Sequence, residues 1–224
     1  TMAVFQVESS GMRAALIQLK PNCLEDIIAL VALYRPGPME NIPKFCRVKN
    51  KLQDREFIHP SIDDLLDETQ GIIVYQEQVM EIARKMAGYT LGQADLLRRA
   101  MGKKIKKDMD AERPRFISGA LKNNIDELLA NRVWLLLEKF ANYGFNKSHA
   151  AAYALVSYQT CWLKANYPIE FMAAVMNNDI NYTDKISFYK HEVNELGICL
   201  LPPSLNKSIE VFIVDSNKII YALG

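Results

Sequence analysis

Basic side chains are concentrated between Arg98 and Arg115, and clustered arginine and lysine form the residue pattern that binds phosphate groups. Arg98 and Arg99 are expected at a helix end beside a Gly-Lys-Lys turn, where they could hold a triphosphate or backbone phosphates from several directions. Acidic residues lie in the same segment, so a solvated helix face is an equally good interpretation. The basic residues of this segment are Arg98, Arg99, Lys103, Lys104, Lys106, Lys107, Arg113 and Arg115.

A second group of polar side chains lies in Gly144–Lys164, with the sequence GFNKSHAAAYALVSYQTCWLK. Asn146 or Ser148 can cap a helix that ends before Pro168. The unpaired N–H groups of its first turn predict an anion site beside Lys147 and His149. One row of this helix is polar, and we expect it to face a phosphate-bearing ligand. The row comprises His149, Tyr153, Ser157, Thr160 and Lys164, and a separate apolar surface comprises Ala150, Ala151, Ala154, Leu155, Tyr158 and Trp162.

The pair Asp108 and Asp110 resembles the carboxylates that hold two metal ions in nucleotidyl transfer. We reject that role, because the pair lies in a lysine-rich run that favours a helix, and helical residues two apart do not face each other. The runs Gly102–Lys104 and Asn146–Ser148 each depart from the phosphate-binding loop pattern. We therefore assign no catalytic residue and no metal ligand.

Helical periodicity dominates residues 1–197, and glycine or proline marks many of the expected helix ends. Arg35–Pro38 should form a rigid turn, and 49–55 an exposed loop. Ser61 resembles the start of a capping box. Trp134, Trp162, Phe140 and Phe171 are expected in the core. The predicted helices cover about 10–20, 24–34, a short stretch from 61, 76–87, 90–101, 108–122, 125–143, 146–167, 169–177 and 183–196.

The pattern changes after Gly197, where short β-type runs replace helical periodicity. These runs are 198–201, 211–214 and 219–221, with Asp215–Lys218 as a hairpin turn. We therefore predict a mainly α fold, in which a multi-helix domain at 1–197 precedes a small β element at 198–224. That element would begin a further region of a larger protein.

Composition narrows the classes of function. The 224 residues are 50% hydrophobic and carry a formal net charge of +1, so any affinity for nucleic acid must come from local clusters. Four cysteines without a C-x-x-C pair and three scattered histidines argue against a disulfide framework or a zinc site, and a reducing cytoplasmic compartment fits. No apolar run approaches the roughly 20 residues of a membrane span, and the N-terminus lacks a signal-peptide layout.

Long strings in this chain resemble the family C DNA polymerases, which are the bacterial replicative polymerase III alpha subunits. The resemblance runs collinearly over essentially the whole chain, which makes it more specific than any isolated motif. The strings are FQVESSGM at 5–12, ALYRPGPM at 32–39, GIIVYQEQVM at 71–80, ADLLRRAMGKK at 94–104, the segment 144–164 quoted above and LPPSLN at 201–206.

The resemblance implies the fingers domain of a DNA-directed DNA polymerase, which holds the incoming deoxynucleoside triphosphate (dNTP) against the template base. Family members hold two Mg²⁺ ions with palm aspartates that lie outside this chain, so the chain alone should be inactive and bind no cofactor. Implied partners are the DNA template-primer, the dNTP, other domains of the polymerase chain and replisome subunits, but no membrane. Implied nucleotide-contact residues are Arg98, Arg99, Lys103, Lys104, Asn146, Lys147, Ser148, His149 and Tyr153, and implied DNA-contact residues are Lys106, Lys107 and Arg113.

Two alternatives stay open beside the fingers interpretation. A non-enzymatic helical DNA-binding or scaffold module would use the basic run for duplex phosphates only, and its DNA binding would depend steeply on salt. A self-sufficient nucleotidyltransferase would need Asp108 and Asp110. The fingers interpretation makes a spatial prediction of its own, that His149 and Arg99 line one cleft.

Overall fold

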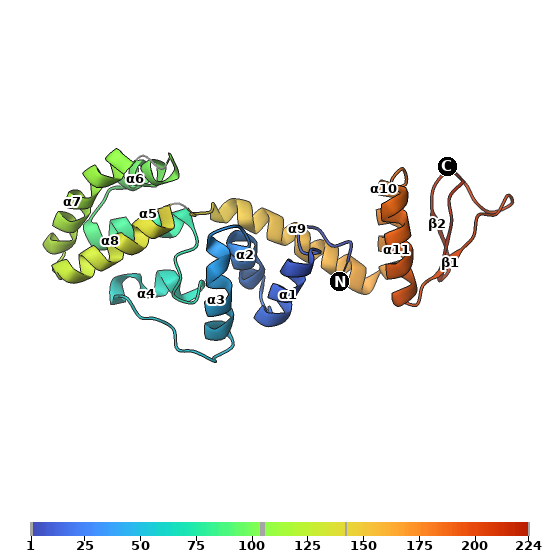
Figure 1. Cartoon of the computed structure of the whole chain (residues 1–224), viewed down its shortest axis with the longest axis horizontal. Helices are drawn as coiled ribbons and strands as arrows, with labels where there is room; N and C mark the ends of the chain where they lie inside the picture. Colours follow the sequence, from blue (N-terminus) through green and yellow to red (C-terminus); the bar gives the residue numbers. More distant parts are fainter. Residues whose placement is uncertain (1, 104–105, 142, 224) are drawn as a thin grey trace. The chain divides into compact units, whose positions relative to one another are not determined.

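The computed structural model describes residues 2–103, 106–141 and 143–223 (Figure 1). This part of the chain is mainly helical, as predicted, with a small sheet near its C-terminal end. Its helices are α1 (Ser10–Leu19), α2 (Leu24–Leu33), the 3₁₀ helix η1 (Pro38–Asn41), α3 (Ile42–Lys49), α4 (Pro60–Asp67), α5 (Gln76–Ala87), α6 (Leu91–Lys103), α7 (Lys106–Lys122), α8 (Glu127–Ala141), α9 (Lys147–Asn166), α10 (Pro168–Asn178) and α11 (Thr183–Glu195).

Several helix ends form where local sequence signals predict them. Thr90 caps α6 because its hydroxyl accepts from the N–H of Gln93 (3.3 Å), while the Gln93 side chain accepts from the N–H of Thr90 (2.9 Å). Gly88 ends α5 with φ of 68°, a conformation that glycine adopts without steric cost. The cap of α9 is Asn146, one of the two candidates, because its Oδ1 accepts from the N–H of His149 at 2.8 Å.

One local prediction is wrong, and one helix was not predicted. The cap of α4 is His59 and not Ser61, because the His59 ring accepts from the N–H of Ser61 and Pro60 opens the helix. Pro114 lies inside α7, within the predicted helix 108–122. Helix α3 was not predicted, because its eight residues include a proline and end in a polar stretch that reads as a loop.

The chain forms two compact units, one of Thr1–Arg13 with Leu155–Gly224 and one of Ala14–Ala154. The divisions fall inside α1 and α9, so each of these helices contributes to both units. The predicted domain boundary after Gly197 stays a prediction.

In the unit Ala14–Ala154, α5, α6, α7 and α8 surround one apolar core together with α4. Its centre is the fully buried Trp134, whose ring lies 5.5 Å from that of Phe116, and Phe116 in turn lies 6.4 Å from Tyr89. Such tilted aromatic pairs add to the stabilisation that area burial supplies. The prediction of Trp134 in the core is confirmed.

Helices α5 and α7 approach each other very closely at Gly119. A Cβ atom added there would lie 2.1 Å from the carbonyl oxygen of Ala87, the last residue of α5. This is a backbone atom that no rotamer change can move away. Glycine is therefore required by the packing of α7 on α5.

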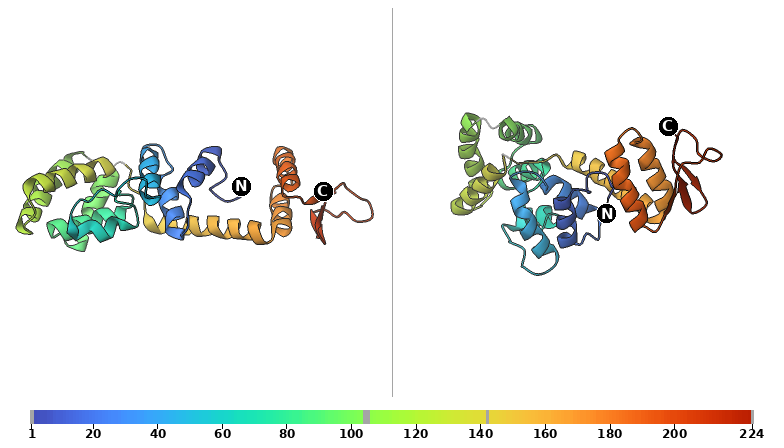
Figure 2. Two further views of the ribbon diagram at one scale, coloured as in Figure 1. Left: turned by 90° about the horizontal axis from the view of Figure 1, so that it is seen from below. Right: turned by 45° about the vertical axis from the view of Figure 1, so that its right-hand side comes forward.

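The C-terminal part of the other unit packs α10 and α11 against a three-stranded sheet, as Figure 2 also shows. Strand β3 (Lys218–Ile220) lies in the centre, parallel to β1 (Cys199–Leu201) and antiparallel to β2 (Ile213–Asp215). The fully buried Met172, Met176 and Ile219 join helices and sheet. The predicted β runs are confirmed to within two residues at each end.

None of the described helices combines the length and the apolar character that crossing a membrane requires.

We predict that Gly119→Ala lowers the free energy of unfolding by about 1–3 kcal/mol, the usual cost of overpacking a core. The matched control is Gly92→Ala in α6, where an added Cβ meets nothing within 4 Å. That variant should be neutral or more stable by up to about 1 kcal/mol, because alanine favours the helix over glycine. Urea unfolding of both variants measures the difference. Equal shifts in the unfolding midpoint would show that the close approach at Ala87 is absent.

Candidate functional site

Arg98 and Arg99 lie near the end of α6, as predicted, and both bind the carboxylate of Asp95. Arg98 donates to Oδ1 from Nε (2.9 Å) and Nη2 (2.7 Å), and Nε of Arg99 lies 2.8 Å from Oδ2. The hydrogen bond from Arg98, together with the charges of both arginines, holds the pKa of Asp95 below its usual value. The Arg99 side chain is 62% exposed, so its remaining donors face solvent.

Gln76, the first residue of α5, connects Arg98 to the segment before α9. Its Oε1 accepts from Nη1 of Arg98 at 3.3 Å, and its Nε2 donates to the carbonyl of Gly144 at 3.3 Å. The backbone N–H of Gln76 also donates to the carbonyl of Phe145 at 2.9 Å. The residues predicted on α6 and at the start of α9 are thus joined through a single side chain.

The start of α9 is already occupied by protein groups. Glu77 accepts from the Nδ2 of Asn146 (2.9 Å) and from the backbone N–H of Lys147 (3.0 Å), and the cap oxygen of Asn146 takes the N–H of His149. A carboxylate at a helix N-terminus is favoured by the helix dipole. At the predicted anion site, the backbone N–H groups of Lys147 and His149 therefore already donate to Glu77 and Asn146 of the same chain.

Lys147 is paired in the same way. Its ammonium lies 2.7 and 2.8 Å from the carboxylate oxygens of Glu68, and 5.5 Å from the centre of the Tyr75 ring. Both Glu68 and Tyr75 precede α5, so this lysine fixes the start of α9 to the start of α5. An approaching phosphate would have to compete with Glu68 for it.

His149 is exposed and belongs to a stack of aromatic rings. Its ring centre lies 4.3 Å from that of Tyr153, one helical turn on, and 5.5 Å from that of Phe145. The Arg35 guanidinium lies 4.3 Å from the Phe145 ring centre, and its Nη2 donates to the carbonyl of Tyr143 at 2.6 Å. The stack therefore extends from the Arg35 turn to α9. Ser148, between the cap and His149, is exposed.

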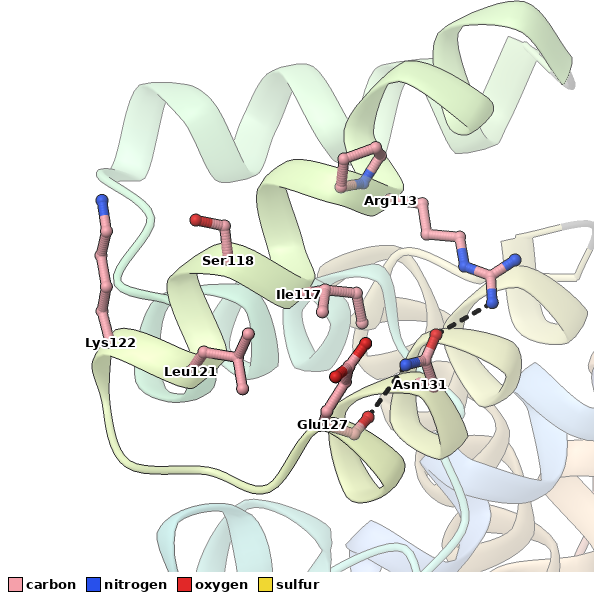
Figure 3. Close-up of a pocket in the computed structure, with 8 residues that line it drawn as sticks. Arg113, Ile117, Ser118, Leu121, Lys122, Glu127 and Asn131 are labelled. Carbon is pink, nitrogen blue, oxygen red and sulfur yellow. Dashed lines mark hydrogen bonds between the residues drawn. The ribbon is translucent and has the colours of Figure 1, made fainter.

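The remaining predicted basic residues differ in how far the structure describes them. Lys104 lies outside the described residues, as do the side chains of Lys103, Lys106 and Lys107. Arg113 is exposed on α7, and its Nη2 donates to Oδ1 of Asn131 on α8 at 2.9 Å (Figure 3). It lies at one end of an open groove of about 640 Å³ between these two helices. The prediction that Arg99 and His149 line one cleft stays a prediction.

The polar row of α9 does not face a ligand along its whole length. Ser157 and Lys164 are buried, and the Lys164 ammonium bonds to the Glu192 carboxylate and, at 2.6 Å, to the carbonyl of Met2. Burial alone would raise the pKa of Glu192. The hydrogen bond and the charge of Lys164 are the largest opposing effects, and the pKa of Glu192 is below its usual value. The row is therefore partly an internal structural contact, stabilised by an ion pair.

The predicted apolar surface of α9 is divided, because its small residues Ala150 and Ala154 are buried whereas its large side chains are exposed. Leu155 is 44% exposed, Tyr158 49% and Trp162 46%, so the prediction of Trp162 in the core is wrong. The physical reason is that the partners of Lys164, Met2 and Glu192, lie far away in the sequence. Helical spacing shows which side chains share a face, but not which face is buried.

Sequence reasoning missed the residues that hold the site together. Gln76, Glu77 and Gln78 are consecutive in the YQEQVM string, and each binds a different partner. Gln78 is buried, accepts from the N–H groups of Val74 (2.8 Å) and Tyr75 (3.0 Å), and donates to Thr69 (2.8 Å). The signal was this run of amide and carboxylate groups at a helix start, where unpaired N–H groups need acceptors.

A magnesium site does not fit the described residues. Among them, no group of three or more His, Cys, Asp or Glu side chains could hold a metal ion. The carboxylates nearest the candidate residues are already neutralised, Asp95 by two arginines and Glu68 by Lys147. We therefore derive no step through a metal ion held by this chain.

Comparison with known proteins agrees with the resemblance. The family described as "Bacterial DNA polymerase III alpha subunit finger domain" matches residues 1–124. The chain is 51% identical over 224 residues to DNA polymerase III subunit alpha of Caulobacter vibrioides, covering all of the chain and 20% of that relative. The same subunit is 53% identical over 215 residues in Rickettsia felis (96% of the chain, 18% of the relative). In Vibrio cholerae it is 51% identical over 232 residues (100% and 20%).

The chain spans about a fifth of the length of these curated relatives. Its family match covers more than half of the chain, and the relatives match it nearly from end to end. By this evidence the chain belongs to the family of bacterial DNA polymerase III alpha subunit finger domains.

Proposed function

We propose that this chain is the fingers domain of a DNA-directed DNA polymerase, where it positions the incoming dNTP and contacts template DNA. The observation that carries the proposal is the hydrogen-bond path from Arg98 through Gln76 to Gly144. This path joins two groups of nucleotide-contact candidates that lie more than 40 residues apart in the sequence.

In this proposal, Arg98 and Arg99 bind the phosphates of the nucleotide. Arg98 is fixed on two sides, by Asp95 and by Gln76, which orients its guanidinium before any ligand arrives. Arg99 is more exposed and has donors to spare. Phosphate and arginine form charge-assisted, bidentate hydrogen bonds, and a triphosphate would compete with Asp95 for them. Lys103, the last residue of α6, and Lys104 would add positive charge.

The start of α9 would form the other wall of the nucleotide site. The ring of His149 packs against that of Tyr153, and both belong to a helix whose first turn Glu77 orients. Aromatic faces of this kind stack on nucleobases or pack on a sugar. Asn146, Lys147 and Ser148 complete this wall, and Glu68 and Glu77 are the carboxylates that a phosphate would displace there.

Contact with DNA phosphates is assigned to Lys106 and Lys107 and to Arg113, which is exposed on α7. The metal chemistry is assigned to a palm domain outside this chain, which would hold the Mg²⁺ ions and bind the primer end. The chain alone should then be inactive. Its partners would be the DNA template-primer, the dNTP, the other domains of the polymerase and replisome subunits in the cytoplasm.

We predict that Arg99→Ala in the full-length polymerase lowers kcat/KM for dNTP incorporation by about 10- to 150-fold. This range corresponds to about 1.5–3 kcal/mol for a charged hydrogen bond in a desolvated site. The matched control is Arg84→Ala, because Arg84 also forms an ion pair one turn away, with Glu81 at 2.5 Å, but on α5. It should change kcat/KM less than twofold.

Single-nucleotide incorporation kinetics measure both variants. If Arg99→Ala leaves kcat/KM for dNTP unchanged and only weakens salt-dependent DNA binding, the chain is the scaffold module of the alternative interpretation.

We predict that Gln76→Met raises the KM for dNTP about three- to tenfold while the protein stays folded. Methionine keeps the side-chain volume but removes both hydrogen bonds, each worth about 0.5–1.5 kcal/mol. The backbone bond from Gln76 to Phe145 remains. A matched control is Gln93→Met, which removes the capping bond at the far end of α6. An effect of equal size in both variants would point to loss of α6 stability instead of loss of the link to Gly144.

A further inference from the structure

A cavity of about 210 Å³ lies in the unit Ala14–Ala154, and the residues that line it include none of those assigned to nucleotide or DNA. The turn that follows α2, the extended segment before α5 and the end of α8 enclose it. Its walls are mainly apolar and include Leu33, Pro38, Ile72, Val74 and Phe140. Leu33, Pro38, Ile72 and Val74 are buried, so these side chains form part of the folded core.

The charged residues of the wall are two of each sign. The positive charges of Lys44 and Lys139 are offset by the negative charges of Glu40 and Glu56. Glu56 accepts from Lys44 at 2.8 Å and from Arg132 at 2.6 Å, and the hydrogen bond from Lys44 lowers its pKa. A ligand with a net charge would have to break these pairs for little gain. A neutral ligand with a hydrogen-bonding edge would meet donors and acceptors without that cost.

The volume fits a small aromatic ring. An enclosed apolar cavity of about 150 Å³ in a protein core binds benzene, so this somewhat larger and partly open cavity has room for one ring. A ring with one polar substituent would place its apolar body against Ile72 and Phe140 and its polar edge among Lys44, Glu56 and Lys139. We propose that this cavity is a binding site for a compact, neutral aromatic molecule.

An occupant of the cavity would contact the segment that leads into α9. Tyr143 is part of the wall, and its ring lies so close to Gly37 that a Cβ added there would be 2.2 Å from its Cε1. The carbonyl of Tyr143 accepts from Arg35, and the next residue, Gly144, accepts from Gln76. Binding in the cavity should therefore act on the same connection that orients the start of α9.

The test is ¹⁹F NMR of 4-fluorophenol with the full-length polymerase. We expect saturable line broadening with the unmodified protein. Two variants fill the cavity. Ala32→Leu adds three carbon atoms at a buried wall position, and Ile58→Trp enlarges a half-buried one that is more tolerant of change. Each should weaken binding at least tenfold. The matched control is Leu52→Trp, at a residue that is 76% exposed and not part of the wall.

Absence of saturable broadening with the unmodified polymerase would overturn the proposal, as would equal binding by the Ile58→Trp variant. A second probe, 4-fluorobenzoate, tests the class of ligand, because its charge should weaken binding at least fivefold relative to 4-fluorophenol. Equal binding of the two would refute the assignment to neutral ligands. The measurement uses neither nucleotide nor DNA, so its outcome is independent of the proposed polymerase role.

Discussion

The pairing of two extended segments, one before α5 and one before α9, is the contact on which the rest of the candidate site depends. The N–H of Phe145 donates to the carbonyl of Val74, and the N–H of Gln76 donates back to Phe145. Two residues some 70 positions apart thus meet as neighbours in a short parallel bridge. Once this bridge forms, Gln76 and Glu77 can reach Gly144 and Asn146 without further movement of the backbone.

Charged groups at the candidate site are neutralised by nearby side chains of opposite charge. The chain has 27 basic and 26 acidic side chains, and the candidate residues reflect that balance. Asp95 forms ion pairs with two arginines, Glu68 pairs with Lys147, and Glu77 accepts a hydrogen bond from the first turn of α9. A carboxylate that holds a cation in place also keeps it from solvent anions. The candidate residues are therefore held in place by contacts within the chain itself.

Local signals in the sequence predict much of the fold and less of the site. Helix caps such as Thr90 and Asn146, and the glycine that ends α5, act through neighbours within four residues, so their sequence context is sufficient. The burial of Lys164 and the exposure of Trp162 depend on partners that lie far away in the sequence. For the same reason the roles of Glu77 and Gln76 could not be derived, although both stand in a recognisable string. A hydrogen bond between residues 69 positions apart leaves no periodic pattern in the local sequence.

The close approach at Gly119 limits how α7 can move. Because the backbone of α7 touches the Ala87 carbonyl with no side chain between them, sliding α7 along α5 by one residue would bring a Cβ atom into that oxygen. Gly119 therefore sets the position of α7 along α5, and the helix cannot shift lengthwise without disturbing this contact.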